Sequence, residues 1–229
     1  YAGGILRSAH RYASDAMVLT MLIHMLRHFA FDRMRGFRWF SWVTGVVLIV
    51  MVYASGINGY MLPWDKMAQF VVTASFEWLD WLPIFNGALI RNFIYQSSVN
   101  DRFFSLLAFI HLGVPLLVLL LMWIHVQRVP KASTNPPRPI IIALLLTMLA
   151  LALVKPAVSQ GGAADFGVTT TTLDFDWFFL IVYPLLYTWS LGHIWALIVG
   201  AMGLLALLPW LPPKFHRDKN AQREFQMTV

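Results

Sequence analysis

Five long apolar runs, almost free of charged residues, set the limits on what this chain can fold into. They extend from His10 to Phe29, Phe40 to Tyr60, Phe103 to Val126, Pro139 to Val158 and His193 to Leu211. About 20 apolar residues are enough to cross a bilayer as a helix. The runs are continuously apolar rather than alternating, so they indicate helices. The sequence therefore predicts an all-α membrane protein, a transmembrane helix bundle with about five spans.

Composition and charge exclude other classes of protein. Only 12% of the residues are charged, against about 25% in a soluble domain. The chain has no cysteine, which excludes disulfides, cysteine-ligated iron–sulfur clusters and thioether-linked haem within it. Its net charge of +6 comes from basic residues at the ends of the apolar runs. That placement is typical of topology signals, so we expect no nucleic-acid partner.

The distribution of charge predicts the topology. With five spans, one side of the membrane receives 11 of the 17 basic residues and three acidic ones. The basic ones are Arg27, Arg33, Arg35, Arg38, Arg128, Lys131, Arg138, Lys214, Arg217, Lys219 and Arg223. The positive-inside rule places this side, and with it the C-terminal tail, in the cytoplasm. The apolar segment Asp176 to Leu191 is then an interfacial helix, because a further crossing would move the basic tail outside.

Four of the seven histidines form two pairs with the same spacing. His10 and His24 are 14 residues apart, as are His111 and His125. Fourteen residues make nearly four helical turns and rise about 21 Å, so each helix carries one histidine near each end on one face. With both helices running inward, His10 comes level with His111, and His24 with His125. Imidazoles facing each other at two depths predict two bis-histidine haem sites.

Charged and small residues accompany the four histidines. Arg7 and Arg27 each lie one turn outward from a histidine, where an arginine pairs with a haem propionate; ordinary membrane anchoring is the alternative. Gly45 and Gly59 are again 14 residues apart, and a missing side chain lets a flat macrocycle approach a helix. Asp15 lies inside the first span, where an ionisable group indicates a proton relay or a structural partner.

Several sequence runs carry a resemblance to a known family. They are Arg7-Ser8-Ala9-His10, His24-Met25-Leu26-Arg27, Trp42-Val43-Thr44-Gly45, Gly59-Tyr60-Met61-Leu62-Pro63-Trp64-Asp65 and Asp101-Arg102-Phe103-Phe104. Together they resemble the cytochrome b family of Rieske-type quinol-oxidising complexes. The aspartate that ends the Gly-Tyr-X-Leu-Pro-Trp run is similar to the shorter b-type subunit of photosynthetic complexes, here fused to a quinol-site segment.

The resemblance implies specific roles for these residues. His10 and His111 would hold the outer haem, His24 and His125 the inner one, and Arg102 would lie near the outer propionates. The family's bundle has a further helix before the one carrying His10, so an expected first helix appears to be missing from this sequence.

The second half resembles the family's quinol-site segment but departs from it. Phe175-Asp176-Trp177-Phe178 stands where the family has Pro-Glu-Trp-Tyr. Asp176 retains a carboxylate that can accept a quinol proton, with a helix N-cap as the alternative reading. Phe178 has no hydroxyl. Near the inner haem, Gln127, Arg128 and Lys131 are candidates for a quinone site, and His28, His193 and His216 are expected to be structural.

The sequence therefore predicts a dihaem b-type cytochrome that exchanges electrons between a quinone pool and redox partner subunits. We expect a dihaem-binding bundle over residues 1–130 and a quinol-site-like segment with two spans over residues 131–229. Partners would be the lipid bilayer, a quinone, a Rieske protein and a c-type cytochrome, within a possible homodimer in a bacterial inner membrane. The alternatives are a dihaem anchor for an iron–sulfur or flavin oxidoreductase and, more distantly, a proton-coupled transporter that uses Asp15.

Overall fold

A computed structural model describes residues 2–129, 132–170 and 172–212. Within them the chain forms seven α-helices: α1 (Ala2–Ala30), α2 (Trp39–Met61), α3 (Lys66–Asp80), α4 (Ala88–Phe93), α5 (Asp101–Val126), α6 (Arg138–Val154) and α7 (Leu191–Leu207). Short 3₁₀ turns connect several of them, and an isolated bridge joins Asp65 to Ala163. The predicted all-helical fold is confirmed. The basic tail from Lys214, together with His216 and Lys131, lies outside the described residues.

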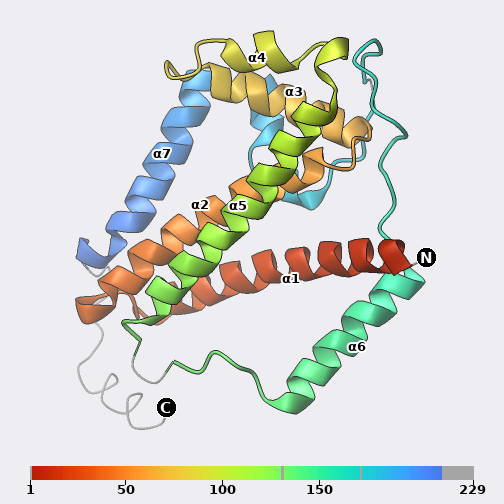
Figure 1. The fold of residues 1–229 in the computed structure, drawn as a ribbon. Coiled ribbons are helices and arrows are strands. Elements are labelled where there is room, and N and C mark those ends of the chain that lie inside the picture. The colour runs from red at the N-terminus through yellow and green to blue at the C-terminus, as the bar shows by residue number, and fades with distance from the viewer. Residues whose placement is uncertain (1, 130–131, 171, 213–229) are drawn as a thin grey trace.

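Helices α2 and α5 pack side by side along their length, and α3 and α4 cover one end of this pair (Figure 1). Helix α7 packs against α2, and α6 packs against α1. The Trp42 indole N–H donates to the carbonyl of Leu205 at 2.6 Å, which joins α2 to α7. The fully buried Ser8 hydroxyl accepts from the N–H of Ala157 at 2.9 Å, which joins α1 to the residues after α6.

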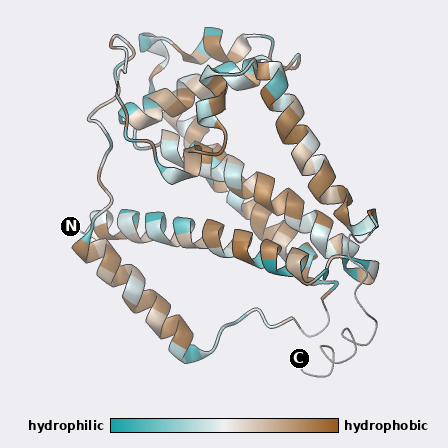
Figure 2. Cartoon of the chain, turned by 180° about the vertical axis from the view of Figure 1, so that it is seen from behind, coloured by the Kyte–Doolittle hydropathy of each residue, from teal (hydrophilic) through white to brown (hydrophobic). Residues whose placement is uncertain are grey.

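Much apolar surface lies on the outside of these helices. Leu112 and Leu116 of α5, Leu145 of α6 and Val199 of α7 are all more than half exposed. Figure 2 shows apolar residues along the whole of α6 and α7. Soluble proteins rarely expose continuous apolar surface of this extent, whereas lipid tails cover it at no cost. The surface is that of an integral membrane protein.

Three of the five predicted spans meet the length and composition of a crossing helix, at residues 36–61, 101–126 and 191–210. Helix α1 is long enough, with 29 residues, but it carries more charged residues. Helix α6 is apolar but has 17 residues, about 25 Å against a hydrocarbon core of about 30 Å. It ends at Val154 rather than Val158, because Pro156 disfavours helical geometry at Lys155. For α1 and α6 the crossing remains a prediction.

The predicted interfacial helix from Asp176 to Leu191 is wrong in form. The segment contains two 3₁₀ turns, Trp177–Phe179 and Tyr183–Tyr187. Pro184 lacks an N–H and disfavours helical geometry at the residue before it, and it stands in the first turn of the second 3₁₀ element. Phe179 and Tyr183 are fully buried in the main apolar core together with residues of α3. The segment therefore belongs to the core at the end of the molecule that α3 and α4 cover.

Candidate functional site

The outer pair of histidines meets across two helices. The imidazole rings of His10 on α1 and His111 on α5 have centroids 6.0 Å apart, with ring planes inclined by 56°. Bonds from imidazole nitrogen to a metal ion are about 2 Å long, so two rings on opposite sides of one ion have centroids about 6 Å apart. The separation of His10 and His111 is compatible with two ligands of a single ion.

Each histidine of α5 faces a glycine of α2. A Cβ placed on Gly59 would lie 2.7 Å from Cε1 of His111, and one placed on Gly45 would lie 3.2 Å from Cε1 of His125. Any larger residue at Gly59 would collide with the His111 ring. The two 14-residue spacings, on α2 and α5, are therefore in register, and the absence of side chains on α2 gives both imidazoles their room.

The inner pair has more polar neighbours. The Thr44 hydroxyl lies 2.9 Å from Nδ1 of His125 and donates to the carbonyl of Phe40 at 2.8 Å. Because a hydroxyl has one proton, its oxygen is then free to accept from the Nδ1–H of His125. That tautomer leaves the lone pair on Nε2, the nitrogen available to a metal ion.

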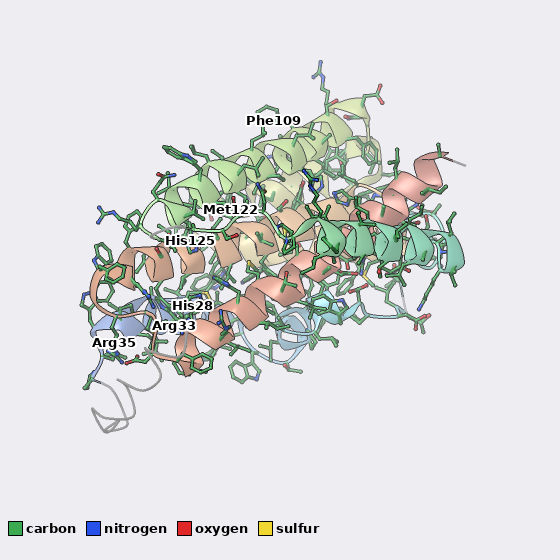
Figure 3. All side chains as sticks on the ribbon, turned by 90° about the horizontal axis from the view of Figure 1, so that it is seen from below. His28, Arg33, Arg35, Phe109, Met122 and His125 are labelled. Atoms are coloured by element: carbon green, nitrogen blue, oxygen red, sulfur yellow. The ribbon has the colours of Figure 1, made fainter. Side chains whose placement is uncertain are left out.

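His28 was expected to be structural, and it contacts a candidate ligand. Its ring centroid lies 4.5 Å from that of His24, one helical turn away. Figure 3 shows His28, Arg33 and Arg35 at the same end of the molecule as His125, whereas Phe109 lies farther along α5. The two depths deduced from the sequence spacing are thus distinct ends of the bundle. Ser190 caps the start of α7 by accepting from the N–H of His193, and its hydroxyl lies 2.6 Å from Nδ1 of the His193 ring.

The three arginines proposed for the propionates, Arg7, Arg27 and Arg102, all have exposed side chains. Arg102 lines a hollow beside α4 with Asn92, Tyr95 and Asn100. No side-chain hydrogen bond or ring contact joins these arginines to the four histidines. Their role as propionate partners therefore stays a prediction.

Arg11, which no sequence motif indicated as a site residue, connects the two acidic candidates, Asp15 and Asp176. Its Nε donates to Asp15 at 3.0 Å, and a terminal N–H donates to Asp176. Its guanidinium also lies over the ring of Tyr60, 4.6 Å from the centroid. The spacing of four residues between Arg11 and Asp15 was a signal for the first contact, but nothing in the sequence indicated the second. Asp176 also accepts from the N–H of Phe178 at 3.2 Å, so the N-cap reading is correct.

Phe178 fills the space next to α2. A Cβ on Gly56 would lie 2.5 Å from the tip of the Phe178 ring. The ring also packs against Tyr53 and Tyr60, with centroids 4.9 and 5.6 Å away. Phe178, which lacks the hydroxyl of the family's tyrosine, therefore packs between the 3₁₀ segment and α2.

The inner quinone candidates make local contacts. The Gln127 amide donates to the carbonyl of Trp123 at 3.2 Å, and Arg128 lies over the ring of Phe40. Among the described residues, no three His, Cys, Asp or Glu side chains gather as a compact metal cluster. The ring contacts between histidines are those of His10 with His111 and of His24 with His28.

A comparison with protein families gives one match. The model described as "Cytochrome b/b6/petB" matches residues 1–132. The chain belongs to the cytochrome b family. As a cytochrome b, it is a haem-binding electron-transfer subunit embedded in a lipid bilayer and working with redox partners.

The residues of this cytochrome b fit the haem that the family binds. Two imidazoles that hold one metal ion need ring centroids about 6 Å apart, and His10 and His111 meet this condition. Gly59 and Gly45 leave the room that the rings of His111 and His125 occupy.

Proposed function

We propose that this cytochrome b holds two b-type haems and carries electrons across the membrane between a quinone or quinol pool and redox partner subunits. His10 and His111 hold the outer haem, and His24 and His125 the inner one. The observation that carries the proposal is the 6.0 Å separation of the His10 and His111 rings. The matched glycines opposite both α5 histidines support the second site.

Haem, when bound, supplies reversible one-electron chemistry. The residues of the chain determine the position of the haem and influence its redox potential. The four histidines would hold the two groups through their ring nitrogens, and Thr44 would orient His125 by accepting from its Nδ1–H. A hydrogen bond to the second nitrogen of a ligating imidazole fixes the orientation of its ring and raises its basicity. Arg7 and Arg102 at the outer end, and Arg27 at the inner end, pair with propionates.

At the outer end, Asp176 is the candidate acceptor for a quinol proton, and Asp15 is a possible relay. At the inner end, Gln127, Arg128 and Lys131 are the candidates for quinone binding. We place the protein in an energy-transducing membrane, a bacterial inner membrane, with its C-terminus in the cytoplasm. We take residues 1–130 as the haem-binding part and residues 131–229 as the quinol-site-like segment.

A second function is favoured by the outer site. Asp176 is engaged by Arg11, and Phe178 is seated against Gly56 where the family has a tyrosine. Both features favour a dihaem membrane anchor whose partner is an iron–sulfur or flavin subunit over a Rieske complex with a c-type cytochrome. Copurification in mild detergent decides between them, because the subunits retained with the chain differ. It also shows whether the chain is present as a homodimer.

Electron transfer across a sealed membrane tests the function. The purified protein is reconstituted in liposomes that contain ferricyanide, and a quinol analogue is added outside. We expect the wild-type chain to reduce the trapped ferricyanide, and we expect His24→Ala, which removes one inner ligand, to stop the reaction. His193→Ala is the matched control, because His193 lies at a helix start away from both pairs. Equal rates in His24→Ala and the wild type would contradict the proposal.

A further inference from the structure

A hollow of about 280 Å³ lies where α4 and the turn after it meet the start of α5. Its lining includes Asn92, Phe93, Tyr95, Arg102, Phe103 and Leu106. The apolar span of α5 begins at Asp101, so the hollow lies at the boundary of the hydrocarbon core, at the depth of lipid headgroups. Pockets that enclose a drug-sized ligand measure about 300–1,000 Å³. The hollow therefore has room for the head of an amphiphile but not for its chains.

The lining of the hollow carries one positive charge and no carboxylate. The cation is Arg102, and none of the described residues forms an ion pair with it. The neighbouring Asp101 is exposed and lies about 100° away around the helix. Asn92 and Tyr95 add an amide and a phenol hydroxyl to the lining. Because a guanidinium binds phosphate oxygens through two parallel N–H bonds, the hollow is suited to a phosphate group.

An exposed apolar track leads away from the hollow along α5. Leu106, Phe109, Gly113 and Leu116 continue from Arg102 at intervals of three or four residues, so they lie on one face of the helix. The three large side chains of the track are 41%, 74% and 67% exposed. A Cβ on Gly113 would meet no atom within 4 Å, which leaves a gap between the side chains on either side of it. The track can hold a hydrocarbon chain that starts at the hollow.

The hollow is separate from the outer pair of histidines. Arg102 and His111 are nine residues apart in α5, which is two and a half turns, so they lie on opposite faces of the helix. None of the four paired histidines lines the hollow. A ligand in the hollow would therefore lie on the face of α5 that is turned away from His111.

We propose that the hollow and the track bind one anionic phospholipid, of the kind that phosphatidylglycerol represents. The phosphate pairs with Arg102, the glycerol hydroxyls bond with Asn92 and Tyr95, and one acyl chain lies along the track. Phosphatidylcholine has the same phosphate, but its trimethylammonium group would meet the Arg102 charge and no carboxylate in the lining. The hollow favours a lipid phosphate as the partner of Arg102 over the propionate that the family resemblance implies.

Native mass spectrometry of the purified, haem-loaded chain tests this, with phosphatidylglycerol or phosphatidylcholine of the same acyl chains added in detergent. We expect Arg102→Gln to bind phosphatidylglycerol about 10- to 100-fold more weakly than the wild type, because one hydrogen bond to a charged group is lost. Arg91→Gln is the matched control and should bind as the wild type does. Arg91 is an exposed cation of α4 that donates to the carbonyl of Asn86 and does not line the hollow.

Equal binding of phosphatidylglycerol by Arg102→Gln and the wild type would overturn the inference, and loss of the outer haem in that variant would then identify a propionate as the partner. Displacement of the lipid by an equal concentration of inorganic phosphate would also overturn it, because the track would then contribute nothing. Should Arg102→Gln fail to fold, the two lipids on the wild type decide. A preference for phosphatidylglycerol supports the inference, and equal binding of both lipids overturns it.

Discussion

Replacing Gly59 by alanine should damage the outer haem site selectively. The added Cβ would lie 2.7 Å from Cε1 of His111, closer than non-bonded carbons approach, and the imidazole is a rigid ring held by its helix. Overpacking of this kind costs about 1–3 kcal/mol. Alanine also improves helix propensity by about 1 kcal/mol over glycine, so the net loss of folding stability is small. Because the added Cβ displaces the His111 ring, it weakens haem binding. We expect the haem affinity of the outer site to drop about 5- to 100-fold.

The assay is a haem titration followed by absorbance, with the two b bands resolved by their potentials. Gly45→Ala is expected to weaken the inner site less, because its Cβ would lie 3.2 Å from His125. Gly113→Ala is the control, since no atom lies within 4 Å of a Cβ there and Gly113 is only two residues from His111. Wild-type outer-haem affinity in Gly59→Ala would refute the reasoning, as would an equal loss in Gly113→Ala.

Three further predictions concern single contacts. Thr44→Val should shift the potential of the inner haem and leave the outer one unchanged, because only His125 loses its Nδ1 partner; a potentiometric titration checks this. Trp42→Phe should lower the free energy of unfolding by about 1 kcal/mol in a detergent-melting assay, because the carbonyl of Leu205 loses its donor. Ser8→Ala should speed proteolysis in the segment that follows α6 several-fold, since the half-buried N–H of Ala157 is left without its acceptor.

Local sequence information was enough for the long helices and for the alignment of the histidines. The apolar runs predicted α2, α5 and α7 to within a few residues, because a membrane leaves a continuous apolar run little alternative to a helix. The 14-residue spacing placed His10 level with His111, since four turns of a helix are a fixed length.

Proline residues and long-range contacts decide the parts of the structure that the sequence did not predict. Pro156 ended α6 early, and Pro184 divided the expected interfacial helix into 3₁₀ turns. Helix α3 was missed although Asp65 caps its start, because its 15 residues mix apolar and polar positions and are too few to span a bilayer. The contact between Arg11 and Asp176 joins residues 165 positions apart, so no local pattern could have indicated it.

The central claim is that four histidines hold two haems, one pair at each depth. A pyridine haemochrome assay of the purified chain measures the number of haems directly. We predict two non-covalent b-type haems per wild-type chain, and one in each of His10→Ala and His24→Ala. In the His10→Ala protein the remaining haem should keep the inner-haem potential. Two haems retained in either variant, or one haem in the wild type, would contradict the account.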